Sequence, residues 1–231
     1  MVRLMYRKYR INDINKKLAI IGVQPLDLMV VGATGAGKST TLNSFFQREV
    51  SKIGKGVDPE TMLINSFSLN DSFRLWDTPG LGDGIIRDKE HSKMLIDLMF
   101  KDYKEQGYTF GFIDLVLIIV DGSGRDMGTT YNLINNVIIP NFQPDRILVA
   151  INQADVAMKG RNWNRQSMKP ERELKQFLEN KVVSIQERIF EATSVKIKTP
   201  VYYTAEYNYN VDKLFDLIID NMPTKKRNIK L

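Results

Sequence analysis

Short apolar runs alternate with amphipathic stretches along most of the chain. Continuous apolar runs at 115–120 and 147–151 are bounded by polar turns, which is typical of central strands covered on both faces. The segment 26–31, which is apolar apart from Asp27, is also expected to be a buried strand. Residues Met62–Leu69 instead alternate between apolar and polar positions, and the apolar segment Phe73–Trp76 follows closely. We therefore expect these last two segments to form a hairpin.

Helical stretches fill the intervals between these strands. We expect helices at about 90–105, 129–138, 170–191 and 211–221, besides one that follows the glycine-rich segment after the first strand. A last short strand lies near 200–203. Because strands alternate with helices, the pattern predicts an α/β fold with a doubly wound, mostly parallel sheet, to which the hairpin adds one antiparallel strand.

The two ends of the chain differ from its middle. Residues 1–24 are basic and loosely amphipathic, which predicts a helical N-terminal arm ahead of Pro25. Residues 25–222 carry the alternating pattern and are expected to form one domain, and 223–231 form a basic tail.

Composition narrows the possible chemistry. The 231 residues include 33 Lys and Arg, 27 Asp and Glu, no Cys and one His, with a net charge of +6. The lack of Cys excludes disulfides, a Cys-ligated zinc site and a cysteine nucleophile. The longest apolar run is far shorter than the roughly 20 residues of a membrane span, and the basic start lacks the apolar core of a signal peptide. We therefore expect a cytoplasmic protein.

The segment Gly32–Ser39, GATGAGKS, matches the pattern G-x-x-x-x-G-K-[ST] between a predicted strand and a predicted helix. Its glycines let successive backbone N–H groups point at phosphate oxygens, and the helix adds its positive N-terminal dipole. Lys38 is expected to reach the β- and γ-phosphates, and the Ser39 hydroxyl to bind Mg²⁺. The residues predicted to bind phosphate are Thr34, Gly35, Ala36, Gly37, Lys38, Ser39 and Thr40.

This loop does not by itself choose between ATP and GTP, because many transporter-type ATPases carry a similar one. The segment Asp77–Gly80, DTPG, ends the next apolar strand. There Asp77 would hold a water ligand of Mg²⁺, and the Gly80 N–H would meet the γ-phosphate.

Two later segments favour guanine. NQAD ends another strand, and its Asp155 can accept hydrogen bonds from both N1–H and N2–H of guanine, which adenine lacks. TAE follows the last strand, where the Ala205 N–H could contact guanine O6. The residues predicted on this side are Asn152, Gln153, Asp155, Thr204, Ala205 and Glu206. All four motifs fall at carboxyl ends of strands, where open α/β sheets bind ligands.

With GATGAGKS, DTPG, NQAD and TAE, the chain resembles the translation-factor-related GTPases over roughly 25–222. It looks most like the septin, chloroplast-import-receptor and immune-associated branch and the small bacterial GTPases related to Era. The resemblance implies a three-layer, Ras-like P-loop G domain that binds GTP or GDP with Mg²⁺. It also implies that Thr61 is the first switch threonine, binding Mg²⁺ with Ser39 and Asp77, and that Lys38, Thr61 and Gly80 stabilise the charge that develops during hydrolysis.

The chain departs from the family pattern in three places. Gln153 stands where the family often has a Lys that covers the base, which predicts weaker guanine binding with unchanged specificity. Leu81 stands where Ras-like members have a Gln that orients water, so hydrolysis needs another group. Gly35 stands where potassium-activated relatives have Asn, so that route lacks its ligand.

Some charged and aromatic residues remain without a firm role. We expect the lone histidine, His91, to be an exposed helix position rather than a base. Arg87 and Arg125 are surface residues or candidates to reach across a homodimer that forms over the nucleotide face. The basic insertion 159–172 is a partner or nucleic-acid surface, or a loop whose Trp163 packs on its own domain.

The sequence is consistent with two functions. The first is slow, Mg²⁺-dependent hydrolysis of GTP to GDP and phosphate. The second is a nucleotide-regulated assembly or binding module in which hydrolysis is negligible. The basic ends could contact RNA, the ribosome or an acidic membrane surface, and a charge of +6 does not decide among these partners.

Overall fold

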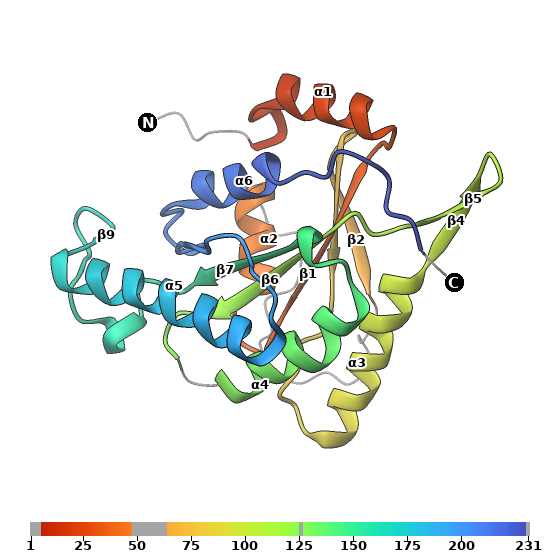
Figure 1. Cartoon of the computed structure of the whole chain (residues 1–231). Helices are drawn as coiled ribbons and strands as arrows, with labels where there is room; N and C mark the ends of the chain where they lie inside the picture. The colour runs from red at the N-terminus through yellow and green to blue at the C-terminus, as the bar shows by residue number, and fades with distance from the viewer. Residues whose placement is uncertain (1–5, 48–63, 125–126, 230–231) are drawn as a thin grey trace.

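The computed structural model describes residues 6–47, 64–124 and 127–229, and its centre is a six-stranded sheet in the order β10-β7-β6-β1-β3-β2 (Figure 1). The strands of this sheet are β1 (Leu26–Gly32), β2 (Asn65–Asn70), β3 (Phe73–Asp77), β6 (Leu115–Asp121), β7 (Ile147–Asn152) and β10 (Val201–Tyr202). All neighbouring pairs are parallel except β2 and β3, which form the predicted hairpin. The predicted mostly parallel sheet with one antiparallel strand is therefore confirmed.

Helices cover both faces of the sheet. They are α1 (Ile11–Ile21), α2 (Lys38–Phe46), α3 (Ile85–Phe100), α4 (Met127–Asn132), α5 (Arg172–Thr193) and α6 (Val211–Asp220). Shorter helical segments are η1 (Tyr6–Lys8), the π-helix η2 (Leu133–Ile138), η3 (Ile139–Asn141), η4 (Pro144–Arg146) and η5 (Ala157–Gly160). Among the described helices, none is long and apolar enough to cross a membrane.

Successive side chains of the central strands pack into two separate hydrophobic cores, one on each face of the sheet. Leu28 and Val30 of β1 are buried against α1, α2 and α6. Met29 and Val31 are buried on the opposite face, against α3, η2 and α5. This gives the three-layer arrangement in Figure 1, and it explains why the apolar positions of β1, β6 and β7 follow one another instead of alternating with polar ones, apart from Asp27 in β1.

The predicted helix at 90–105 is wrong at both ends. The helix α3 begins at Ile85, directly after Gly84, and ends at Phe100. Beyond it, β4 (Asp102–Glu105) and β5 (Tyr108–Gly111) form a hairpin that projects from the domain (Figure 1). A second small hairpin pairs β8 (Trp163–Asn164) with β9 (Lys169–Pro170).

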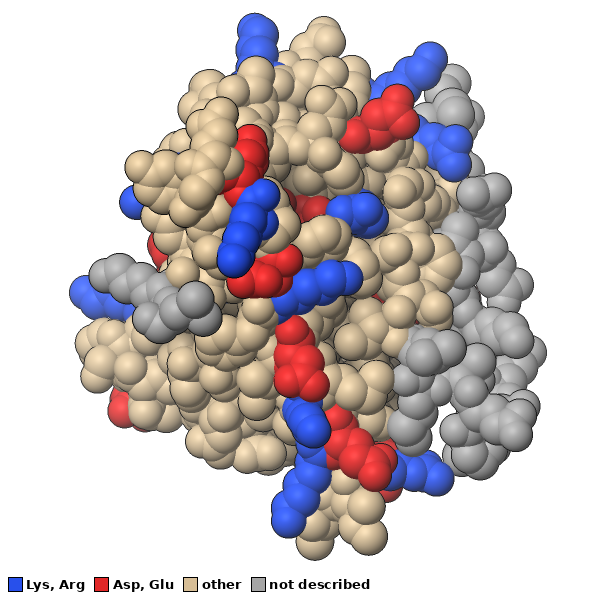
Figure 2. Space-filling view, turned by 90° about the vertical axis from the view of Figure 1, so that its right-hand side faces the viewer, with Lys and Arg blue, Asp and Glu red and all other residues tan. Residues whose placement is uncertain are grey.

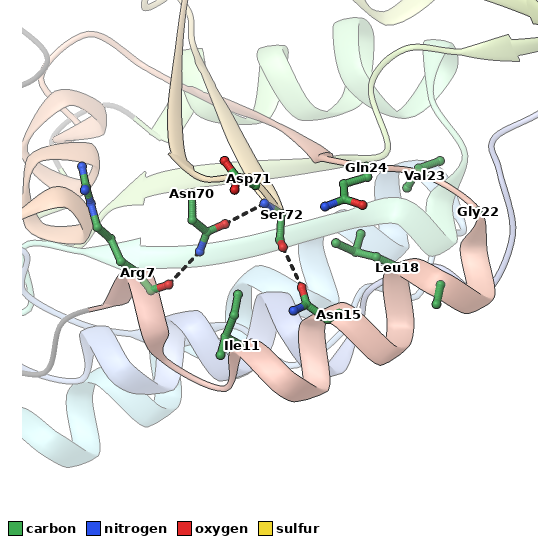
Figure 3. Close-up of a pocket in the computed structure, with 11 residues that line it drawn as sticks. Arg7, Ile11, Asn15, Leu18, Gly22, Val23, Gln24, Asn70, Asp71 and Ser72 are labelled. Carbon is green, nitrogen blue, oxygen red and sulfur yellow. Dashed lines mark hydrogen bonds between the residues drawn. The ribbon is translucent and has the colours of Figure 1, made fainter.

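The N-terminal helix packs on the domain. Ile14, Leu18 and Ile21 of α1 are buried in the same core as β1 and α6. A cavity of about 690 Å³ lies between α1 and the β2–β3 turn, and Figure 3 shows the polar contacts at its wall. There the Ser72 hydroxyl donates to Asn15 Oδ1 (2.6 Å) (Figure 3). The domain boundary at residue 24 stays a prediction.

The basic C-terminal segment is also held in place. Arg227 is buried, and its guanidinium donates to the carbonyl oxygens of Ile113 (2.7 Å) and Met99. Burial and the nearby Arg146 lower the pKa of Arg227 to about 10. Acidic and basic side chains are interspersed on the face shown in Figure 2 rather than gathered into a patch of one sign. Arg227 is therefore a structural anchor and is not exposed to RNA or lipid.

Candidate functional site

The predicted site residues within the described part of the chain lie at the carboxyl edge of the sheet, in strand ends, in the loops that follow them and in the first turn of α2. One such loop joins β1 to α2 and contains Gly35 (φ 81°) and Gly37 (φ 87°), both in the left-handed region that favours glycine. A Cβ at Gly37 would lie 2.2 Å from Asn152 Nδ2, so this position also has no room for a side chain. The glycines thus let the phosphate loop approach the loop after β7.

Lys38, the first residue of α2, is 8% exposed. Its ammonium donates to the carbonyl oxygens of Gly32 (3.1 Å) and Ala33 (3.2 Å). Burial lowers the pKa of Lys38 to about 8, and the charges of Asp77 and Asp83 act in the opposite direction. A negatively charged group beside this ammonium would offset the cost of burying its charge.

The segment after β3 lies against the phosphate loop. Asp77 ends β3 and pairs in register with Val30 of β1. A Cβ at Gly80 would lie 2.6 Å from Thr34 Oγ1 and 2.8 Å from Lys38 Nζ, so only glycine fits there. The Asp77 and Gly80 motif and the phosphate loop are therefore direct neighbours, as their positions at the ends of adjacent parallel strands predict.

Leu81 and His91 are both buried next to this segment. Leu81 is fully buried in the core beneath α3, and its carbonyl oxygen accepts a hydrogen bond from the Thr34 N–H (2.7 Å). The expectation that His91 is exposed is wrong: it is 2% exposed, and its Nδ1–H donates to the Gly80 carbonyl (2.7 Å). The expected surface residue Arg87 is partly exposed on α3.

The loops after β7 and β10 form the other half of the site. Asn152 Nδ2 donates to the Ala36 carbonyl (3.1 Å), and Asn152 Oδ1 accepts a hydrogen bond from the Ala205 N–H (3.1 Å). The amide of Gln153 donates to the Gly35 carbonyl (2.8 Å). Asn152 therefore links three loops. A nucleobase that accepts a hydrogen bond from the Ala205 N–H would share this donor with Asn152 Oδ1 or displace Asn152 from it.

Asp155 and Thr204 face each other at the same place. The Thr204 hydroxyl donates to Asp155 Oδ1 (3.1 Å) and accepts from the Asp155 N–H (3.2 Å). A pocket of about 290 Å³ opens beside them, lined by Gly37, Thr40, Asn152, Gln153, Asp155, Val156, Thr204 and Glu206. Val156 is 40% exposed here and was not predicted, although it directly follows the predicted motif.

Metal-binding capacity at this edge comes from isolated oxygen donors. Ser39 is the second residue of α2, and Asp77 ends the neighbouring strand. Within the described residues, no group of three or more His, Cys, Asp or Glu side chains gathers to hold a metal. A hydroxyl and one carboxylate are the sparse donor set that Mg²⁺ uses when phosphates and waters complete its shell. Thr61, the third predicted ligand, lies outside the described residues, as does Arg125.

The basic insertion folds onto its own domain, as the second of its two interpretations predicts. Trp163 stacks on Tyr207, with 5.9 Å between ring centroids, and meets Tyr209 edge to face at 5.5 Å. Both tyrosines follow Glu206 in the loop that lines the pocket. The insertion therefore supports the guanine-side loop with its aromatic ring.

Comparisons with known proteins find matches in sequence and in fold. A family model described as 50S ribosome-binding GTPase matches residues 27–187. The "Probable GTP-binding protein EngB" of Thermotoga sp. (strain RQ2) is 30% identical over 96 residues, 42% of this chain and 46% of that protein. Toc33 from Arabidopsis thaliana, in complex with GDP and Mg²⁺, superposes with a TM-score of 0.66 at 16% identity, covering 98% of this chain and 95% of Toc33.

Era from Aquifex aeolicus, bound to GDP and AlF4⁻, gives a TM-score of 0.56 at 17% identity, covering 87% of this chain and 58% of that chain. At such identities the structural matches establish the fold alone. The chain also matches only about half the length of the EngB relative. Together these findings confirm the predicted resemblance to Era-like and Toc33 receptor GTPases, while the septin-like resemblance stays a prediction.

Proposed function

We propose that this chain, which belongs to the 50S ribosome-binding GTPase family, is a guanine-nucleotide switch that binds GTP and GDP with Mg²⁺ and hydrolyses GTP slowly. The observation that carries the proposal is Asn152, which joins the phosphate loop at Ala36 to the base-side loop at Ala205. A ligand in contact with both loops needs phosphates at one end and a base at the other. A cytoplasmic location belongs to the proposal on sequence grounds alone.

Guanine is favoured over adenine by the acceptor at the base end. Asp155 and Thr204 flank the pocket beside Gly37. A carboxylate accepts the two adjacent N–H donors of guanine, whereas adenine would leave its charge without a partner. The curated EngB relatives are named GTP-binding proteins, which supports the same choice.

The phosphate end of the site supplies positive charge and hydrogen-bond donors, but among the described residues we assign no side chain as the general base that would activate water. Lys38 would neutralise the β- and γ-phosphates, the Gly80 N–H would meet the terminal phosphate, and Ser39, Asp77 and Thr61 would hold Mg²⁺. When bound, Mg²⁺ neutralises charge on the transferred phosphate. Since the Leu81 side chain is buried, it cannot orient the attacking water, which accounts for slow hydrolysis.

A second copy of the chain is the proposed source of the missing group. An arginine supplied in trans can raise the rate of GTP hydrolysis by about 10³–10⁵. Toc33 offers support by analogy, because an arginine-to-alanine variant of that protein is described as dimerization deficient. Arg87 on α3 and Arg125 are the candidates in this chain. Specific GTP turnover that rises over a hundredfold range of protein concentration would support this; constant turnover would point to an external activator.

The alternative function is a nucleotide-regulated binding module with negligible hydrolysis, and the buried Leu81 favours it for the isolated chain. One solved Era structure contains nucleotides of 16S ribosomal RNA, and that statement concerns Era. Calorimetry with GTP, GDP and ATP tests nucleotide choice first. Retention of protein or RNA on the chain loaded with a GTP analogue, but not with GDP, then tests the module. Equal affinity for ATP and GTP would contradict the guanine assignment.

A further inference from the structure

Two side chains of α3 contact the backbone at the end of the DTPG motif and just beyond it. Asp88 Oδ1 accepts hydrogen bonds from the N–H groups of Gly82 (2.8 Å) and Asp83 (3.2 Å). One turn further along the helix, His91 Nδ1–H donates to the Gly80 carbonyl (2.7 Å). Residues three apart share one face of a helix. We call Asp88 and His91 the α3 clamp.

The clamp acts on Gly80, which lies against the phosphate loop. Gly80 is so close to Thr34 and Lys38 that a Cβ would lie within 2.8 Å of Lys38 Nζ. On its other side, the next residue is fixed by the bond from the Thr34 N–H to the Leu81 carbonyl (2.7 Å). The clamp therefore determines where the Gly80 backbone sits relative to the Lys38 ammonium.

We propose that the α3 clamp positions Gly80 for the terminal phosphate of a nucleoside triphosphate and thereby sets the preference for GTP over GDP. The inference rests on the proposed function and assigns His91 as a positioning residue. GTP carries a γ-phosphate for the Gly80 N–H and GDP does not. A displaced Gly80 therefore weakens binding of the triphosphate and leaves binding of the diphosphate unchanged. One misplaced hydrogen bond corresponds to roughly a fivefold to tenfold loss of affinity.

The test compares two substitutions at the same buried position. His91→Leu removes the donor and keeps an apolar side chain in the core. His91→Asn places an amide N–H close to where Nδ1–H lies and should restore the bond to the Gly80 carbonyl. Affinities are measured with fluorescent GDP and with a fluorescent, non-hydrolysable GTP analogue, both with Mg²⁺. We expect His91→Leu to lose about fivefold to tenfold for the analogue with GDP within twofold, and His91→Asn to stay close to wild type.

A second pair of variants covers the case in which His91→Leu does not fold. Asp88→Ala removes the other half of the clamp from a more exposed site and should lower affinity for the analogue alone, by about two- to threefold. Lys89→Ala, at the exposed neighbouring position, is the control and should change neither affinity.

The outcomes separate the clamp from the site itself. Equal losses for both nucleotides in His91→Leu, or no rescue by His91→Asn, would show that His91 serves only the core and would overturn the proposal. If the clamp variants fold and bind both nucleotides as the wild type does, the proposal is again wrong while the guanine site stands. Failure of wild-type protein to bind either nucleotide would instead overturn the proposed function.

Discussion

The two ends of the central sheet both bury charged side chains, but they compensate them differently. At the carboxyl end, the Lys38 ammonium donates to two backbone carbonyl oxygens, and the charges of Asp77 and Asp83 also act on it. At the amino end, Asp27 is 5% exposed and accepts two hydrogen bonds from the Arg74 guanidinium (2.6 and 2.8 Å). The Trp76 indole N–H adds a third (2.6 Å). The Lys38 ammonium is therefore hydrogen-bonded to backbone dipoles, whereas Asp27 is paired directly with an opposite charge.

This difference separates a binding site from a structural network. A buried charge that is hydrogen-bonded to dipoles rather than paired directly with an opposite charge keeps part of its desolvation cost, and an incoming phosphate offsets that cost. A charge that is paired with an opposite charge has little uncompensated desolvation cost for a ligand to offset, and removing its partner destabilises the fold. Substitutions at the carboxyl end should therefore change ligand binding, and substitutions at the amino end should change stability.

The largest expected effect is at Asp155. Asp155→Asn replaces an acceptor of guanine N1–H and N2–H with an amide whose N–H groups oppose them. Two charge-assisted hydrogen bonds at about 1.5–3 kcal/mol each correspond to a loss of GTP affinity of at least about a hundredfold. The variant should gain xanthosine triphosphate, whose altered edge suits an amide, and calorimetry with both nucleotides checks this. Unchanged GTP affinity would remove Asp155 from the base site.

Lys38→Met should have the next largest effect. It removes the cation expected to contact the β- and γ-phosphates, and GTP affinity should fall by roughly ten- to a hundredfold. The nucleotide-free protein should melt no lower than wild type at pH 7, because Met fills the buried site without a charge.

Lys38 also predicts a pH dependence of the nucleotide-free protein. The folded-state pKa of about 8 lies below the usual 10.5, so the unfolded chain binds more protons between these values. The free energy of unfolding should therefore rise from pH 8 to pH 10 in the wild type relative to Lys38→Met. Melting curves in matched buffers measure the difference, and parallel pH profiles would contradict it.

That the candidate site residues lie together at one edge of the sheet was predictable from sequence, because they follow strand ends in short local motifs. Asn152 and Ala205, for example, belong to different motifs, yet parallel strands bring both to one edge of the sheet. The contact between His91 and Gly80 was not predictable. It depends on how α3 packs: the helix begins at Ile85 rather than near residue 90, and the buried His91 ring in its second turn contacts the Gly80 carbonyl.

The β4–β5 hairpin shows why the fold was only partly predictable. Tyr103 follows Met99 at a helical spacing of four residues, so the amphipathic pattern continues past the true end of α3. The chain turns instead at Gln106 (φ 52°) and Gly107 (φ 83°), two consecutive left-handed residues that suit a two-residue hairpin. The C-terminal segment also bonds to this hairpin, through the Gly111 N–H and the Arg227 carbonyl (2.7 Å), a long-range contact that no local pattern reveals.

At the amino end, Asp114→Asn tests whether this network is structural. Burial, together with the charge of Asp27, raises the pKa of Asp114 to about 7, while its bond from the Asp27 N–H and two arginines act against this. A raised folded-state pKa means that stability is full near pH 4 and is lost as the pH rises through 7. Asn keeps an oxygen that can accept the Asp27 N–H. The variant should gain about 1–3 kcal/mol over wild type at pH 8 and little at pH 4.5.

The measurement for Asp114→Asn is chemical denaturation at both pH values, with GDP affinity as the control. Guanine-nucleotide affinity should stay within twofold of wild type, because Asp114 lies just ahead of β6, at the end of the sheet opposite the phosphate loop. A stability gain that is the same at both pH values would show that titration of Asp114 is not its source. A large loss of GDP affinity would break the proposed separation between the two ends.

The smallest expected effect is at Gln153, where the chain departs from its family at the binding end itself. The Gln153 amide already donates to the Gly35 carbonyl (2.8 Å), so a hydrogen bond joins the two loops without a lysine. Gln153→Lys can keep that bond and add an aliphatic stem over the base, and we expect GTP and GDP to bind about two- to fivefold more tightly. The preference for guanine over adenine should not change, because Asp155 determines it.

The control is Gln153→Ala, which lacks both the hydrogen bond to Gly35 and the aliphatic stem. It should bind GTP and GDP a few-fold more weakly than wild type, and calorimetry on the three proteins ranks their affinities. A lysine variant that binds no better than Gln153→Ala would show that position 153 contributes to neither loop geometry nor base stacking.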